Sequence, residues 1–267
     1  MEKTIKIDKI IHSSKEQSSL TLQAEMKVFV YENETGLNSD FEIYPRIAIS
    51  GNEPFEGKVL DHLWIDEKRC LEICGYDSQR GIYTARATSQ LVLKPGNKFE
   101  HIKRIFRATV ITLSDRASRG EYDDLSGKLL RDKIISYFNQ IGYPVSVEYE
   151  LIGDDTKLLA RLLDDQFNGS VDFIFTTGGT GIGPRDLTVP VVRKMIDFEL
   201  PGIMDLVRVK YGMQNPAAVL SRSIAGVKDK KMIFCLPGSV KAVREYFSEI
   251  EKILLHASFM LHAIDKH

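Results

Sequence analysis

The chain has 267 residues, of which 43% are hydrophobic and 27% are charged, and its formal net charge is -1 at pH 7. This length exceeds the usual size of one domain, and the composition is typical of globular domains with cores of their own. The sequence contains no sustained stripe of Lys and Arg, which argues against nucleic acid or an anionic membrane as a partner and favours a small-molecule substrate.

Targeting and redox signals are weak. The polar start MEKTIKID does not resemble a signal peptide, and apolar runs such as VDFIFTT are far shorter than the roughly 20 residues of a membrane helix. Cys70, Cys74 and Cys235 are too few and too irregularly spaced for a disulfide framework. Cys70 and Cys74 are either ordinary core or surface residues, or part of a metal site whose other ligands are not evident. We therefore expect a cytoplasmic protein.

The N-terminal part, residues 1–103, is predicted to be a small β-rich, barrel-like domain. Its short alternating runs are rich in β-branched and aromatic residues, and NETG, GNEP and KPGN mark turns between them. The predicted strands are TIKIDKII (4–11), LTLQAEMKVFVY (20–31), YPRIAIS (44–50), VLDHLWI (59–65), RCLEICGY (69–76) and GIYTARA (81–87). The boundary to the next domain lies near residues 96–106.

The C-terminal part, residues 104–267, changes to buried strands that alternate with amphipathic helices. This pattern predicts a doubly wound α/β domain whose mostly parallel sheet is covered on both faces. Strands are expected at residues 108–114, 145–153, 171–179 and 230–238, and helices at 126–142, 155–169, 189–198, 203–212 and 240–263. In such folds the ligand lies outside the carboxyl ends of the strands, so the residues that follow each strand are the candidates for a site.

The four predicted strand ends carry carboxylates, hydroxyls and glycines. In chain order these are Ser114, Asp115 and Arg116; then Asp154; then Thr177, Gly178, Gly179, Thr180 and Gly181; and last Pro237, Gly238 and Ser239. Glycines and free backbone amides at a helix start can bind phosphates. The spacing of these glycines is neither a Walker nor a Rossmann fingerprint. The alternative is that the glycine-rich segment is only a tight connection between a strand and a helix. Arg185, Asp186 and Thr188 follow directly and add a cation and a carboxylate.

Five blocks in the second half, taken together, resemble the molybdopterin adenylyltransferase family, which includes stand-alone bacterial enzymes and is similar to the G domain of gephyrin. The blocks are SDRASRGEYDDLSGKLL (114–130), TTGGTGIGPRDLT (176–188), ELPGIMDLVR (199–208), AVLSRSIAG (218–226) and LPGSVKAVRE (236–245). The resemblance implies a Mg2+-dependent transfer of AMP from ATP to the terminal phosphate of molybdopterin, with release of pyrophosphate. It also implies a homo-oligomer, a trimer in this family, and a molybdate-inserting enzyme as the downstream partner.

Two acidic positions of this family match Asp154 and Asp186. The resemblance implies that Asp154 holds Mg2+ or orients the phosphates, and that Asp186 positions the pterin or its reacting phosphate. Each carboxylate has a structural alternative as a helix N-cap, Asp154 for the helix that follows it and Asp186 for the helix at Thr188. Asp115 and Arg116 match a strand-end pair of the family, and Arg116 could instead pair with a carboxylate for structural reasons.

Five further positions match blocks that border the cleft. Ser221 and Arg222 correspond to the family's pterin side, and Pro237, Gly238 and Ser239 to its nucleotide side, where Ser239 could equally be the N-cap of the last helix. Asp205 departs from the family, which often has Glu there. Because Asp is one methylene shorter, any contact made through this position is in question.

The N-terminal part resembles the β-barrel domain at the C-terminus of molybdenum-cofactor sulfurases, through residues 36–50 and 81–97. This implies a domain that holds the pterin or a sulfur-carrying partner; the alternative is a degenerate barrel that serves assembly or stability.

Two other functions remain open for the whole chain. The same fold occurs in proteins that bind molybdopterin or act as scaffolds without adenylylating it, and a similar GGTG block occurs in the molybdate-inserting enzyme. Whether the final cofactor contains molybdenum or tungsten is not encoded in these motifs.

Overall fold

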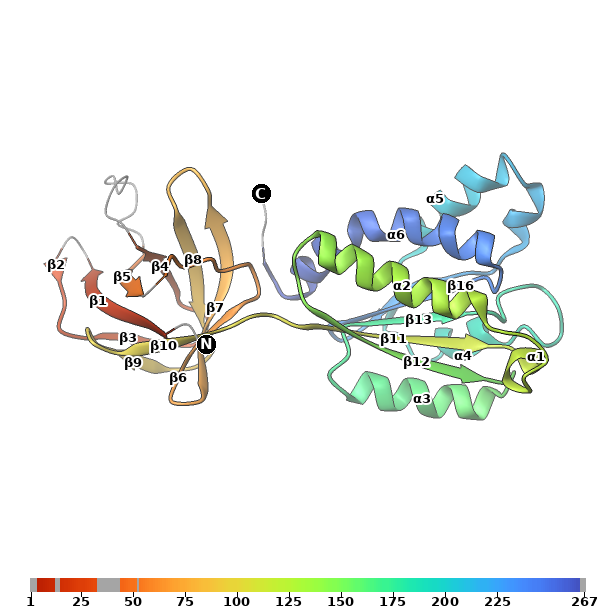
Figure 1. The fold of residues 1–267 in the computed structure, drawn as a ribbon, viewed down its shortest axis with the longest axis horizontal. Coiled ribbons are helices and arrows are strands. Elements are labelled where there is room, and N and C mark those ends of the chain that lie inside the picture. Colours follow the sequence, from red (N-terminus) through yellow and green to blue (C-terminus); the bar gives the residue numbers. More distant parts are fainter. Residues whose placement is uncertain (1–3, 13–14, 33–43, 52, 265–267) are drawn as a thin grey trace. The chain divides into compact units, whose positions relative to one another are not determined.

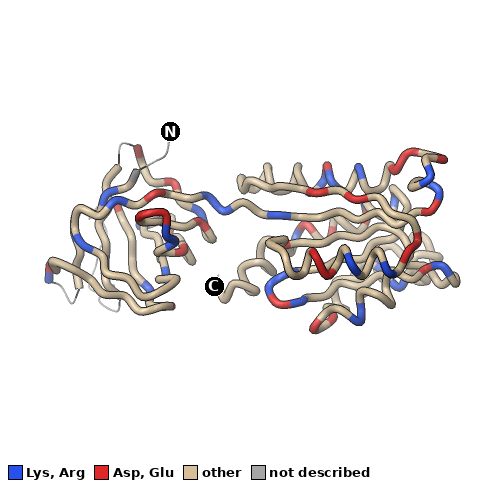
Figure 2. Tube along the Cα trace, turned by 90° about the horizontal axis from the view of Figure 1, so that it is seen from below, with Lys and Arg blue, Asp and Glu red and all other residues tan. Residues whose placement is uncertain are grey.

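The computed structural model describes residues 4–12, 15–32, 44–51 and 53–264. Within these ranges the chain divides into two compact units, the first ending at Arg104 and the second running from Ile105 to Ala263. No helix in the described ranges combines the length and the hydropathy needed to cross a bilayer. Figure 2 shows that basic and acidic residues are interspersed along both units in the part of the chain that is drawn in colour.

The first unit is built from strands. They are β1 (Thr4–His12), β2 (Lys15–Glu16), β3 (Leu20–Leu22), β4 (Lys27–Tyr31), β5 (Arg46–Gly51), β6 (His62–Ile65), β7 (Lys68–Asp77), β8 (Ile82–Ala87), β9 (Leu91–Leu93) and β10 (Lys98–Ile102). Among the described strands, seven pair in the order β10-β6-β7-β8-β4-β5-β1, and β1 pairs again with β10, which closes a barrel. The predicted barrel is therefore confirmed.

Alternating burial explains why these segments form a barrel. Ile47 and Ile49 of β5 and Val28 and Val30 of β4 are buried in one core, while Ala48 and Phe29, which lie between them along the strands, are more exposed. The closing strand β10 was not among the predicted strands, because its single fully buried side chain, Phe99, gives it little hydrophobic signal. The NETG turn (33–36), part of the GNEP turn and residues 36–43 of the sulfurase-like segment lie outside the described residues.

The second unit alternates strands and helices. Its strands are β11 (Phe106–Leu113), β12 (Val145–Ile152), β13 (Phe173–Thr177), β14 (Phe198–Glu199), β15 (Ala225–Lys228) and β16 (Lys231–Leu236). Its helices are α1 (Asp115–Ser118), α2 (Leu125–Gln140), α3 (Thr156–Asn168), α4 (Thr188–Arg193), α5 (Pro201–Gly212), the 3-10 helix η2 (Pro216–Leu220) and α6 (Val240–Leu261). The sheet order is β12-β11-β13-β16-β15-β14, with the first four strands parallel and the last two antiparallel.

Helices cover both faces of this sheet, as the alternation predicted (Figure 1). Ile174 of β13 faces a core that includes residues of α3 and α4, whereas Phe175 contacts Phe234 of β16 and Phe247 of α6. Two local predictions were wrong. The helix expected at 189–198 is only the short α4, and β14 and β15 add an antiparallel edge that was not predicted.

The parallel order explains the position of the site. Because β11, β12, β13 and β16 run in the same direction, their carboxyl ends lie at one edge of the sheet. The loops at residues 114–124, 153–155, 178–187 and 237–239 leave from that edge.

Candidate active site

Two open pockets lie at this edge. The first, which we call the carboxylate pocket, has a volume of about 480 Å³ and is lined by Leu113, Ser114, Asp115, Arg116, Arg119, Glu121, Tyr122, Asp154, Gly179, Gly183, Pro184, Arg185 and Asp186. The second, the glycine-loop pocket, has a volume of about 520 Å³ and is lined by Gly178, Gly179, Thr180, Gly181, Ile182, Asp186, Ala217, Leu220, Ser221, Pro237, Gly238 and Ser239. Gly179 and Asp186 line both, so the two pockets adjoin.

Most of the predicted site residues line one pocket or the other, but four do not. Thr177 and Thr188 are buried; their hydroxyls donate to the carbonyls of Pro237 and Gly178, each at 3.0 Å, and so hold the glycine loop in place. Arg222 and Asp205 also lie outside both linings.

The glycine loop approaches its surroundings too closely for side chains. Gly178 has φ +103° and Gly179 has φ +65°, a region that residues other than glycine rarely adopt. A Cβ at Gly178 would meet the carbonyl oxygen of Leu113, and one at Gly179 would meet the Thr188 hydroxyl. The glycines therefore bring bare backbone to the floor between the two pockets.

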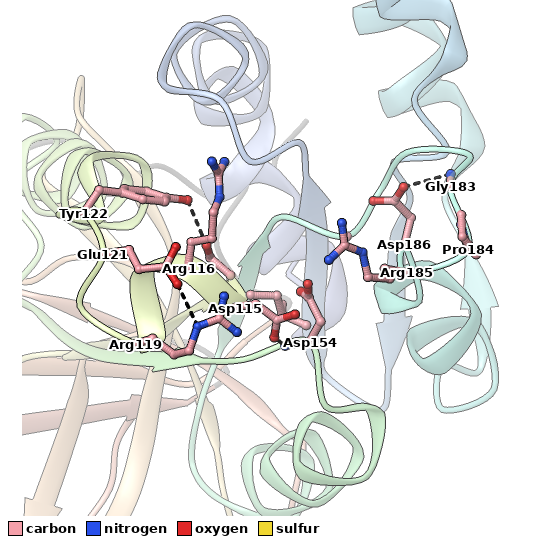
Figure 3. Close-up of a pocket in the computed structure, with 13 residues that line it drawn as sticks. Asp115, Arg116, Arg119, Glu121, Tyr122, Asp154, Gly183, Pro184, Arg185 and Asp186 are labelled. Carbon is pink, nitrogen blue, oxygen red and sulfur yellow. Dashed lines mark hydrogen bonds and ion pairs between the residues drawn. The ribbon is translucent and has the colours of Figure 1, made fainter.

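Asp154 lies in the carboxylate pocket beside Asp115, as Figure 3 shows. The Asp154 amide donates to Asp115 Oδ1 at 2.9 Å, which ties the loop after β12 to the loop after β11. Partial burial raises the pKa of Asp154, the nearby Asp115 and Asp186 raise it further, and Arg185 opposes them. The N-cap of α3 is Asp155, whose carboxylate accepts the amides of Lys157 and Leu158, so Asp154 is not the helix cap.

Asp186 also has no capping role. Leu187 occupies the N-cap position of α4 and makes no side-chain capping bond. The Asp186 carboxylate instead accepts the Gly183 amide at 2.9 Å, which closes the turn at residues 183–186 (Figure 3). Arg222 binds the carbonyls of Gly181, at 2.6 Å, and of Asp186, so this arginine braces the loop between the pockets from outside.

The carboxylate pocket is also lined by three residues that were not predicted from the sequence, Arg119, Glu121 and Tyr122. The Tyr122 hydroxyl lies 2.8 Å from Ser114 Oγ, and the Arg116 guanidinium lies 5.2 Å from the Tyr122 ring centre, so Arg116 contacts an aromatic ring. Arg119 Nε donates to Glu121 at 2.8 Å. All three lie within the 114–130 block, but nothing in their spacing indicated which of its side chains line a pocket.

The remaining predicted residues have local structural contacts. Ser239 is the N-cap of α6 and also lines the glycine-loop pocket, so both interpretations apply. Ser221 Oγ lies 2.7 Å from Ser223 Oγ. Asp205 binds Arg208 at 2.6 Å, and Arg208 in turn donates to the Ser223 carbonyl at 2.9 Å, so Arg208 links Asp205 to the segment around Ser221.

The carboxylates suit one mode of Mg2+ binding. Over the described residues, no three His, Cys, Asp or Glu side chains come together as a complete metal site. Mg2+ is usually bound through one or two carboxylates, with phosphate oxygens and water as its other ligands. Asp154 and Asp115 supply such a pair. Burial and the negative charge of Asp115 raise the pKa of Asp154, and a bound cation would offset both effects.

Comparison with known proteins gives consistent matches to this unit. The family described as a probable molybdopterin binding domain matches residues 109–256, more than half of the chain. Molybdopterin adenylyltransferase of Helicobacter pylori strain J99 is 37% identical over 139 residues, which cover 51% of this chain and 76% of that protein. Gephyrin of Dictyostelium discoideum is 30% identical over 195 residues, covering 71% of this chain and 27% of gephyrin.

A solved structure matches in the same way. The molybdopterin biosynthesis enzyme MoaB of Thermus thermophilus superposes with a TM-score of 0.53 at 34% identity, covering 59% of this chain and 97% of that protein. The family match does not extend into residues 1–108, so the sulfurase-like resemblance of the first unit stays a prediction. Through its second unit, the chain belongs to the molybdopterin-binding family.

Proposed function

We propose that this chain is a molybdopterin adenylyltransferase of molybdenum-cofactor biosynthesis, which transfers AMP from ATP to the terminal phosphate of molybdopterin and releases pyrophosphate. Relatives that carry this name support the enzyme class. The single observation that carries the proposal is the pair of adjoining pockets that share Gly179 and Asp186. Such a site can hold two substrates with their reacting phosphates at the junction.

The side chains present suit phosphoryl chemistry. An oxygen of the pterin's terminal phosphate attacks the α-phosphorus of ATP, and the bond to the pyrophosphate oxygen breaks. This step needs alignment of the two phosphates and neutralisation of negative charge more than it needs a nucleophilic side chain. Backbone amides of the glycine loop and the guanidinium groups of Arg116 and Arg185 supply such interactions. Asp186, which lines both pockets, would orient the reacting phosphate.

Asp154, with Asp115 beside it, would hold Mg2+. The ion would supply charge neutralisation at the phosphates when bound. Asp154 is the better candidate of the two for direct contact, because the Asp115 carboxylate already accepts a backbone amide.

The proposal includes a homotrimer in the cytoplasm, where ATP is available, and a molybdate-inserting enzyme that takes the product. Large apolar side chains on and next to α5 and η2 support an oligomer contact: Leu206, Val209, Met213, Val219 and Leu220 are all more than half exposed. Light scattering of the purified chain measures the subunit number, and a monomer at micromolar concentration would contradict this part.

The test of the activity is to incubate the purified chain with molybdopterin, ATP and Mg2+, and to measure pyrophosphate and the adenylylated pterin. Asp154→Ala and Asp186→Ala should each lower kcat/KM by about 100-fold or more, as the loss of a group that stabilises the transition state does. Asp164→Ala, which changes an exposed carboxylate on α3, is the matched control and should react like the wild type. Pterin binding without release of pyrophosphate would instead indicate the non-catalytic binding or scaffold protein.

A further inference from the structure

The loop between β11 and α2, residues 114–124, forms one wall of the carboxylate pocket. Besides Ser114, it contributes the lining residues Asp115, Arg116, Arg119, Glu121 and Tyr122. Backbone hydrogen bonds fold residues 114–121 onto one another: the amides of Ser118, Arg119, Gly120 and Glu121 donate to carbonyls between Ser114 and Ala117. The two ends of the loop then determine where this folded segment lies in the pocket wall.

The first end of the loop is fixed by Ser114. The Ser114 amide donates to the Ile152 carbonyl at 2.9 Å, and the Ser114 hydroxyl caps α1. The same hydroxyl meets the Tyr122 hydroxyl at 2.8 Å, so the loop folds back on its own start. Tyr122 is nevertheless about half exposed, and this one contact does not fix the second end of the loop.

The second end is fixed by Asp124, a buried carboxylate that no step of the proposed reaction uses. Asp124 Oδ1 accepts the amides of Ser126 and Gly127, each at 3.0 Å, and the Ser126 hydroxyl at 2.7 Å. Asp124 Oδ2 accepts the hydroxyl of Tyr149, on β12, at 2.7 Å. The start of α2 is thus fastened to the neighbouring edge strand through one side chain.

The surroundings of Asp124 leave little freedom. A Cβ at Gly127 would meet Thr112, the Asp124 carboxylate and the Tyr149 ring, so the helix start lies directly on the strands. Burial favours a higher pKa for Asp124, but the polar groups of Thr112, Gly127, Ser126 and Tyr149 outweigh it and hold the pKa below its usual range. Asp124 is therefore a charged hydrogen-bond acceptor at neutral pH.

We infer that Asp124 and Tyr149 are positioning residues for the adenylyl transfer: by holding the end of the 114–124 loop they keep Arg116 and Tyr122 in the wall of the carboxylate pocket. Tyr122 stands two residues before Asp124. With each residue spanning up to about 3.5 Å, release of Asp124 would let the Tyr122 ring and the Arg116 guanidinium on it shift by several ångströms. The inference rests on the proposed function, because it concerns the rate of that reaction.

The experiment uses Tyr149→Phe, which removes one hydroxyl from a half-buried side chain and keeps the ring. Tyr211→Phe is the matched control: the Tyr211 hydroxyl also donates to a carboxylate, Glu249 at 3.2 Å, but it ties α5 to α6 and lines neither pocket. Two kinds of measurement are made on the full chain. Steady-state kinetics with Mg-ATP and molybdopterin give kcat and KM, and hydrogen exchange reports on the amides of residues 115–123.

Tyr149→Phe should lower kcat/KM by about tenfold, because small displacements of positioning groups cost this much or more, and should speed exchange in the loop alone. Tyr211→Phe should change neither. Asp124→Asn, which keeps the cap and can bond to Tyr149, should retain most of the activity that Asp124→Ala loses.

Several outcomes would overturn the inference. Wild-type kinetics and wild-type loop exchange in both Tyr149→Phe and Asp124→Ala would do so, and so would faster exchange spread evenly over the second unit, which indicates a purely structural role. Failure of the proposed function looks different: the wild type itself would then release no pyrophosphate, and loop exchange would still decide whether Asp124 and Tyr149 order the pocket wall.

Discussion

At Asp154, the position proposed for catalysis carries an energetic cost. Burial and the neighbouring Asp115 raise its pKa, so the ionised carboxylate makes the folded state less stable as the pH rises through the folded pKa. Removing the charge should relieve this cost while it removes the group that the proposed reaction needs. This is the trade between stability and activity that is expected at a functional site.

Asp154→Asn should therefore be more stable than the wild type at pH 7 and inactive. The gain should stay below about 1 kcal/mol because the carboxyl is only partly buried and solvent screens its charge, and it should shrink as the pH falls toward the ordinary Asp pKa of about 4. Urea unfolding at pH 7 and pH 4 measures both effects, with Asp164→Asn as the control. A variant less stable than the wild type at pH 7 would show that Asp154 has a structural role.

The backbone of Gly178 makes a second prediction at this scale. Gly178→Ala should lower the free energy of unfolding by more than about 2 kcal/mol, because the new Cβ meets the Leu113 carbonyl and the positive φ is strained. Gly202→Ala, in α5, has nothing within 4 Å of the new Cβ and should be neutral or slightly stabilising. Equal stability of the two variants would refute the close approach.

At the scale of elements, the start of α3 separates two adjacent carboxylates. Asp155 caps the helix, and the amides of Leu158 and Lys157 hold its pKa below the usual value, whereas Asp154 faces the pocket. A group with a lowered folded pKa contributes stability above its unfolded pKa and loses it as the pH falls through the folded one.

Asp155→Ala should consequently lower the Tm at pH 7, by an amount that disappears in acid below about pH 4, and should leave adenylyl transfer unchanged. Asp154→Ala should abolish adenylyl transfer without lowering the Tm at pH 7. Thermal unfolding by circular dichroism and the pyrophosphate assay, run on both variants, check the pair. Loss of activity in Asp155→Ala with an unchanged Tm would exchange the roles assigned to the two residues.

At the scale of the whole molecule, each unit contains buried cores of its own. The match to the Thermus MoaB structure includes 97% of the MoaB chain but only 59% of this chain. A protein of about the size of the second unit therefore exists as a separate chain. The second unit should therefore fold without the first.

Residues 105–267 produced alone should keep the kcat/KM of the full chain, and calorimetry of the full chain should show two unfolding transitions. Both results follow if the site and the core that supports it lie within one unit. An unfolded or inactive fragment would show that the barrel contributes to the activity, and a single transition would show that the two units unfold together.

Much of this protein is determined by its sequence alone. Alternation of period two marks the barrel strands, and buried strands between amphipathic helices mark the α/β unit. Since the carboxyl ends of parallel strands meet at one edge, reading the residues after each strand was enough to find Asp115, Asp154, the glycine loop and Ser239. Motif order added the family, to which the chain belongs.

Only the tertiary structure decided what each side chain contacts. Asp154 and Asp155 are adjacent and chemically identical, and where α3 begins determines which of them is the cap. Arg222 braces a loop that is distant in sequence, and Tyr122 joins the pocket wall through Ser114. Strand β10 is identified by its pairing with β1 and β6, which closes the barrel. Local periodicity reports which face of an element is buried, whereas these contacts depend on which distant segment lies against it.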